Sequence, residues 1–288
     1  MIKQNHGFNM RKLSPWMLLL PAFVLMIGVF FMSLFQFFSY SLYSYTAGKI
    51  EYTHTFYNYI KFVTDGYYAN VLLTTITLAA KSTALALLIG YPLAYACVRL
   101  KSPAAKMAVI VIVFLPLVIS VVVRLYGWFI LLSTKGFINW LLQAVGITSK
   151  PIQLLYKQSA IVVGNVHVLL AYMVFPIFSS LSSMSPSVKE AAYDLGANKL
   201  RRFMTVTFPL SISGVLSGVQ VVFTLALSAY VTPVMLGGGR IMVLARVIYE
   251  DTLGMNWPMA AASGAIMLAL SFVILTLFNR IEYFVRTE

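Results

Sequence analysis

Between Ser187 and Pro209 the chain reads SVKEAAYDLGANKLRRFMTVTFP. This stretch is the longest strongly polar segment in the C-terminal half of the chain, and long apolar runs without charge flank it on both sides. Because charged groups are costly to bury, we expect this segment to lie in water, outside the apolar part of the protein.

The composition indicates a membrane protein. Of the 288 residues, 60% are hydrophobic and 10% are charged, whereas a soluble domain has about 45–50% apolar and about 25% charged residues. The net charge of +13 does not indicate a nucleic-acid partner, because the basic residues lie in short loops between apolar runs, as in membrane proteins. The single cysteine, Cys97, excludes a disulfide framework, and no metal-ligand spacing is present.

Six apolar segments reach the length of about 20 residues that a helix needs to cross a bilayer. A strand barrel would instead need short segments of alternating polarity, which the sequence lacks. The first run has no charged residue between Leu13 and Gly48, so it is too long for a signal peptide and is interpreted as an uncleaved helix. We therefore predict an all-α membrane protein with one domain, residues 1–288. The expected helices cover residues 15–38, 71–98, 107–132, 159–181, 211–236 and 258–279.

The basic residues also predict the orientation. With the N-terminus inside the cell, the inner segments hold twelve Lys and Arg residues and the outer loops hold seven. Since cytoplasmic loops carry the excess of positive charge, we expect both termini and the polar segment 185–209 in the cytoplasm.

The polar segment has the signals of a helical elbow. Ser187 and Glu190 have the spacing of a capping box, and the basic residues come later, where they complement a helix dipole. Gly196 either ends the first helix or lets another backbone approach closely. Pro209 is then expected to begin the next membrane helix.

The same segment resembles the signature loop of the membrane subunits of ABC importers. The resemblance rests on Glu190-Ala191-Ala192, three residues, Gly196, nine residues, Val206, one residue and Phe208-Pro209. Val206 and Phe208 stand where that family has isoleucine and leucine, which keeps both positions apolar.

A second resemblance concerns the branch of that family. Residues 124–128, 132–139 and 90–94 resemble the permeases of spermidine and putrescine importers, so the implied cargo is a polyamine or a related small charged solute. This branch is also similar to permeases for opines, phosphonates and ferric iron, which stay open as alternatives.

The resemblance implies a type I importer fold in the bacterial inner membrane. It also implies three kinds of protein partner: a cytoplasmic ATPase dimer, a second homologous permease subunit and an external solute-binding protein. The chain has no phosphate-binding loop of its own, so no cofactor is expected on it, and ATP and Mg²⁺ would bind to the partner ATPase. The residues implied in coupling are Glu190, Ala191, Ala192, Asp194, Gly196, Arg201 and Pro209.

Ionisable residues inside membrane segments are candidates for function. Lys81 and Arg124 are the two cations there, and Tyr126, Trp128 and Tyr172 are aromatic candidates for the pore or for cargo amines. His167 is interpreted as a satisfied core residue. At the outer mouth, Asp65, Glu250 and Asp251 could attract a polycation or could pair with Arg246 and Lys61.

Two basic residues at membrane depth suit an anionic cargo at least as well as a polyamine. Other classes of protein fit the sequence less well. A secondary transporter would need an inverted repeat, which we do not find, and a membrane enzyme would need a cluster of catalytic groups at membrane depth, so no catalytic residue is predicted. A purely structural scaffold would not need the signature loop.

Overall fold

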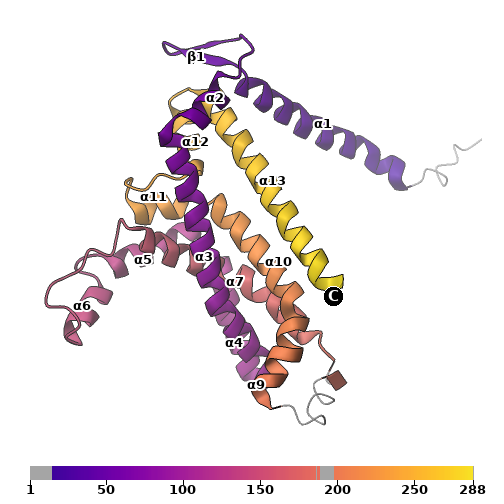
Figure 1. Cartoon of the computed structure of the whole chain (residues 1–288), viewed down its shortest axis with the longest axis vertical. Helices are drawn as coiled ribbons and strands as arrows, with labels where there is room; N and C mark the ends of the chain where they lie inside the picture. The colour runs from indigo at the N-terminus through magenta and orange to yellow at the C-terminus, as the bar shows by residue number, and fades with distance from the viewer. Residues whose placement is uncertain (1–14, 186, 189–197, 288) are drawn as a thin grey trace, which may run out of the picture.

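The computed structural model describes residues 15–185, 187–188 and 198–287. In these residues the chain is almost entirely helical, and one short hairpin joins the first helix to the rest (Figure 1). The elements are α1 Pro15–Ser41, β1 Ser44–Thr46, β2 Lys49–Glu51, α2 Tyr57–Thr64, α3 Gly66–Arg99, α4 Pro103–Val118, α5 Val121–Leu132, α6 Phe137–Ala144, α7 Gln158–Ser182, α9 Lys199–Arg202, the π-helix η2 Phe203–Thr207, α10 Phe208–Leu227, α11 Val231–Gly237, α12 Leu244–Leu253 and α13 Trp257–Thr287.

Six helical segments of the described chain are long and apolar enough to cross a membrane, which confirms the predicted fold class. The predicted span 159–181 agrees closely with α7, and the predicted span 71–98 lies within α3 but starts five residues after α3 does. The predicted first and last spans are both too short, because α1 continues to Ser41 and α13 continues to Thr287.

The predicted single helix over residues 107–132 is wrong, because the chain breaks between α4 and α5. Pro116 lies inside α4, two residues before its end at Val118. The last turn of α4 tightens, with the Ile119 amide donating to the Pro116 carbonyl across 3.2 Å. Ser120 is extended, with ψ of 134°, and α5 starts after it.

The predicted span over residues 211–236 is also divided. The helix α10 ends at Leu227, and the separate short helix α11 starts at Val231. Pro233 explains the interruption, because in a continuous helix its ring would clash with the carbonyl four residues earlier. The Ser228 hydroxyl donates to the Thr224 carbonyl across 3.3 Å, which helps to end α10.

The helix that follows the polar segment starts before Pro209, not at it. Lys199 to Leu227 form one continuous helical segment, and η2 is a π-helical turn just before the proline. The Phe208 amide donates to the Phe203 carbonyl, five residues back. This wider turn leaves room for the Pro209 ring, which cannot fit the ordinary α-helical pattern.

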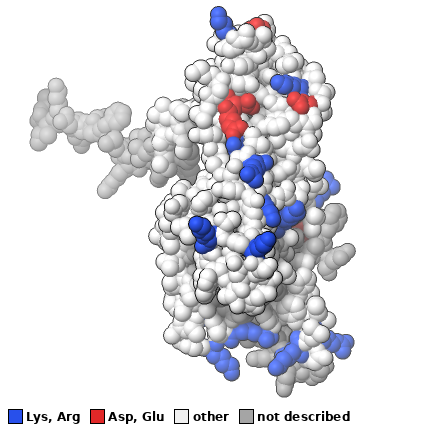
Figure 2. All heavy atoms as spheres, turned by 90° about the vertical axis from the view of Figure 1, so that its left-hand side faces the viewer, with Lys and Arg blue, Asp and Glu red and all other residues white. Residues whose placement is uncertain are grey.

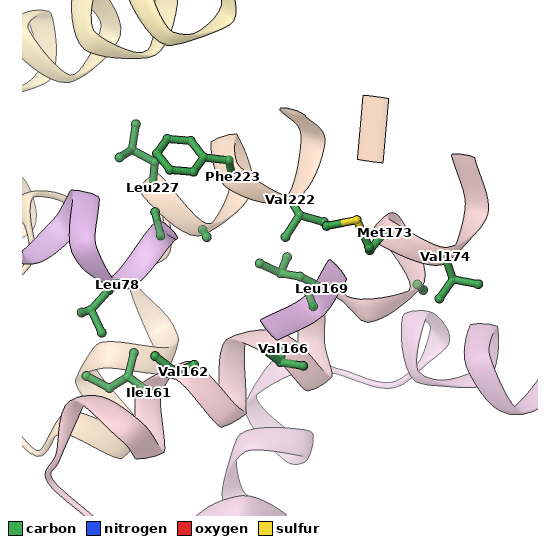
Figure 3. Close-up of a cluster of buried hydrophobic side chains, with 14 of the residues drawn as sticks. Leu78, Ile161, Val162, Val166, Leu169, Met173, Val174, Val222, Phe223 and Leu227 are labelled. Carbon is green, nitrogen blue, oxygen red and sulfur yellow. The ribbon is translucent and has the colours of Figure 1, made fainter. Parts of the chain in front are cut away.

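The helix α7 is the centre of the main core, and it packs against α3 on one side and α10 on another. Figure 3 shows Val222 of α10 facing Met173 of α7, and Phe223 beside Leu227. The backbones of α7 and α10 approach closely at Gly214, where a Cβ would lie 2.6 Å from the Pro176 carbonyl oxygen. Small residues permit such close approach between membrane helices.

The end of the molecule that carries α2 and α12 has its own small core. Phe62 and Val71 pack there with Leu244 and Met259, beside the hairpin β1–β2. The helix α1 leaves this end and runs away from the bundle (Figure 1). It contacts α13, and its described side chains from residues 19 to 32 are exposed.

Candidate functional site

A cavity of about 440 Å³ lies where the two helix breaks meet α7. The α4–α5 break contributes Ser120, the α10–α11 break contributes Tyr230, and α7 contributes Asn165 and Tyr172. Non-helical backbone at membrane depth is tolerated where protein covers it or where it lines a water-filled cavity. The cavity is therefore the candidate solute site of the described chain.

Arg124 of α5 is the charged residue of this cavity. Its Nε atom and one terminal nitrogen, NH1, are buried and have no hydrogen-bond partner among the described residues. The predicted aromatic residue Tyr172 lines the same cavity, although 48 positions separate it from Arg124. The packing of α5 against α7 brings these two predicted residues together.

The other predicted aromatic residues do not line the cavity. Tyr126 is 58% exposed, and its ring stacks on Phe129 with 6.2 Å between ring centroids. The indole N–H of Trp128 donates to Nδ1 of His167 across 2.9 Å. His167 is thus a satisfied residue of the helix bundle, as predicted, and Trp128 is its partner.

Lys81 lies on a different surface from Arg124. Its ammonium donates to Oε1 of Gln158 across 3.1 Å, and the pair borders an apolar groove lined by Leu85 and Val162. A role for Lys81 in the pore stays a prediction, but the structure does not bring it to the cavity of Arg124.

The three carboxylates predicted at the outer mouth have different local roles. Asp65 caps α3 by accepting from the Tyr67 amide across 2.9 Å. Glu250 pairs with Arg246 at 2.7 Å, as one of the two sequence interpretations expects. Asp251 keeps one buried oxygen without a hydrogen-bond partner in the described residues, and burial raises the pKa of this carboxyl above 3.8, although Lys61 opposes that shift.

Charge is distributed unevenly along the molecule. On the face in Figure 2, acidic side chains lie in the upper half, and the charged side chains at the lower end are basic. The lower end in Figure 1 carries α9, and a small cavity of about 150 Å³ there is lined by Arg99, Lys199 and Arg202. The Arg99 guanidinium lies 4.3 Å from the centroid of the Tyr95 ring.

Most of the predicted coupling residues, namely Glu190, Ala191, Ala192, Asp194 and Gly196, lie outside the described residues. The part that follows them is ordered by Asn198, whose Oδ1 accepts from the Arg201 amide across 2.8 Å and caps α9. Arg201 and Pro209 therefore lie in one continuous helical segment, Lys199–Leu227.

Sequence reasoning missed the polar lining of the cavity. Asn165 is 2% exposed, and its amide nitrogen donates to the Ser82 hydroxyl across 3.3 Å. An asparagine inside an otherwise apolar helix was the available signal for it. Ser120 and Tyr230 carried no such signal, because their role depends on two helix breaks that hydropathy does not reveal.

Comparison with known proteins agrees with this architecture. The family model for binding-protein-dependent transport system inner membrane components matches residues 86–287. The chain is 30% identical over 235 residues to the spermidine/putrescine transport system permease protein PotB of Escherichia coli K12. This match covers 81% of this chain and 85% of that protein. It is 31% identical over 214 residues to PotB of Haemophilus influenzae, covering 74% of each. In fold it is similar to a chain of a bacterial ABC transporter involved in alginate import, with a TM-score of 0.76, 18% identity and coverage of 96% of both chains.

Proposed function

The chain belongs to the family of binding-protein-dependent transport system inner membrane components, and from this premise we propose that it forms half of the translocation pore of an ATP-driven polyamine importer. Permease subunits of this family are multi-pass proteins of the bacterial inner membrane, and this chain is one of them. The observation that carries the proposal is the similarity to spermidine/putrescine permeases across 81% of the chain.

The energy for transport comes from ATP hydrolysis by a separate subunit. The segment 185–209 docks on a cytoplasmic ATPase dimer, which binds ATP and Mg²⁺, and both termini lie in the cytoplasm. The basic side chains around α9 support this orientation, because cytoplasmic loops are rich in Lys and Arg. Movement of the elbow between Asn198 and Pro209 passes directly into α10, since Lys199 to Leu227 form one continuous helical segment.

The pore is completed by a second permease subunit, and an external solute-binding protein delivers the cargo. Within this chain the cargo path includes the cavity at the two helix breaks, with Tyr172 as an aromatic wall for an amine. Asp251 at the other end of the molecule supports capture of a cation before entry, because one of its oxygens has no hydrogen-bond partner in the described chain.

Transport in a reconstituted system tests the proposal. The chain is co-expressed with the ATPase, second permease and binding protein encoded by neighbouring genes and placed in proteoliposomes. We expect ATP-dependent uptake of labelled spermidine that unlabelled putrescine inhibits. Inhibition only by 2-aminoethylphosphonate, an opine or ferric iron would reassign the cargo, and uptake that persists without the ATPase would indicate a secondary transporter.

A further inference from the structure

The cavity at the helix breaks is lined by a cationic side chain that no acidic residue of the described chain neutralises. Arg124 lines it with Ser120, Asn165 and Tyr172, and none of the lining residues is acidic. Two guanidinium nitrogens, Nε and NH1, are buried without a hydrogen-bond partner in the described residues. Arg124 as a whole is partly buried, and an anion close to these two nitrogens would offset the cost of burying them unpaired.

The acidic residues of the described chain do not supply that anion. They belong to the hairpin, to the α2–α3 junction, to α12 and to the C-terminal part of α13, and none of them lines the cavity. These residues are Glu51, Asp65, Glu250, Asp251 and Glu282.

The rim of the cavity indicates that protein covers it. Val118, at the α4–α5 break, is 87% exposed and Ile119 is 42% exposed, beside backbone that is not helical. On the α7 side, Tyr172 is 41% exposed. Irregular backbone at membrane depth cannot face lipid, so a second permease subunit seated here would satisfy both the exposed break and the unpaired guanidinium.

We propose that Arg124 is a resident cation that pairs, in the cargo-free transporter, with a carboxylate of the second permease subunit, and that the ammonium groups of the cargo displace it. The inference rests on the proposed function, because it assumes an amine cargo. Exchange of one cation for another leaves the carboxylate neutralised in both states. The carboxylate is therefore never left unpaired, and small cations are kept out when cargo is absent.

The first test compares Arg124→Gln and Arg124→Lys with Lys135→Gln, a control on an exposed loop residue, all in the complete transporter in proteoliposomes. We expect Arg124→Gln to raise the cargo-independent leak of K⁺ at least threefold and to lower the KM for spermidine uptake. The control stays within twofold of the wild type, and Arg124→Lys, which keeps the positive charge, raises the leak less than Arg124→Gln does. Unchanged leak and KM in Arg124→Gln would overturn the inference. Loss of uptake in Arg124→Gln, rescue in Arg124→Lys and inhibition by anionic solutes would also overturn it, because Arg124 would then bind an anionic cargo.

A second test does not depend on the folding of Arg124 variants. Ser120 lines the cavity and makes no side-chain cap hydrogen bond, and Cys97 is the single cysteine of the chain. In a Cys97→Ser background, Ser120→Cys is paired with cysteines placed next to each Asp or Glu in the membrane helices of the second subunit. We expect one position to cross-link in the cargo-free state and to cross-link at least threefold less with spermidine and binding protein present. Absence of any cross-link next to a carboxylate would overturn the inference.

The two tests separate this inference from the proposed function. If the wild-type transporter fails to import polyamines, the uptake measurements fail for every variant, including the control. The leak of K⁺ and the cargo-free cross-link are measured without polyamine, so they still report whether Arg124 has a carboxylate partner in the second subunit.

Discussion

Trp128 of α5 and His167 of α7 are joined by a hydrogen bond in which the indole N–H donates to Nδ1 across 2.9 Å. Because an indole can only donate, the accepting nitrogen of His167 carries no proton. The rings meet edge to face, with 5.8 Å between centroids. The bond holds α5 against α7 one helical turn away from Arg124, and so it helps to fix the wall of the cavity.

Removal of this hydrogen bond should destabilise the subunit. Trp128→Phe keeps an aromatic ring but removes the donor to the part-buried Nδ1 of His167, which costs about 1 kcal/mol. We expect a lower Tm for the purified transporter. Tyr126→Phe is the matched control, since Tyr126 is an exposed aromatic residue of the same helix. Equal Tm values for the two variants would show that the bond does not contribute to stability.

The close contact of α10 with α7 should not tolerate an added methyl group. A Cβ at Gly214 would lie 2.6 Å from the Pro176 carbonyl oxygen, which belongs to the backbone and cannot rotate away. We expect Gly214→Ala to cost about 1–3 kcal/mol, as other overpacked sites do, and to reduce recovery of the folded transporter in detergent. Gly127→Ala is the control, because no atom lies within 4 Å of its added Cβ. A neutral Gly214→Ala would contradict the packing seen here.

Hydropathy predicted the helical fold well because long apolar runs have one stable form in a bilayer. It missed the breaks at Ser120 and Ser228 because the residues around them are apolar too. At the second break the ring of Pro233 acts on the carbonyl four residues earlier. The first break comes after Pro116, which lies within α4.

The candidate site was predicted only in part for the same reason. Arg124 and Tyr172 stood out as a cation and an aromatic residue in apolar runs, and the structure places them in one cavity. Lys81 stood out equally, yet its partner is Gln158 on a different surface. Sequence alone gives the position of a residue along its helix, but it does not give which neighbouring helix that residue faces.

Asp251 predicts a pH dependence of stability. Burial raises the pKa of its carboxyl in the folded protein above the ordinary value of 3.8, so the folded state holds its proton to higher pH than the unfolded state does. Stability from this group is therefore lost as pH rises from about 4 through the raised pKa. We expect Asp251→Asn to raise Tm relative to the wild type by more at pH 7 than at pH 4. A Tm difference that does not change with pH would contradict this assignment.

The coupling proposal predicts a separation of assembly from transport. Gly196→Asp adds a charged side chain where we expect the ATPase groove to approach closely, so uptake should be abolished while membrane insertion remains normal. Glu190→Ala should have a milder effect, because loss of a helix cap costs only about 1 kcal/mol. Uptake of labelled cargo and co-purification of the ATPase are measured together. Normal uptake and normal co-purification in Gly196→Asp would remove Gly196 from the coupling surface.

The π-helical turn before Pro209 predicts that this proline sets the angle of the elbow. The Phe208 amide reaches back five residues to Phe203 because the Pro209 ring blocks the ordinary pattern. In Pro209→Ala the blocked N–H returns, so the turn can become α-helical and rotate α9 by about 100° relative to α10. We expect the transporter to assemble and hydrolyse ATP but to import at least fivefold less cargo per ATP. Pro103→Ala, which changes a proline in the first turn of α4 where no ladder bond is lost, should leave that ratio unchanged. An unchanged ratio in Pro209→Ala would mean that coupling does not depend on the π turn.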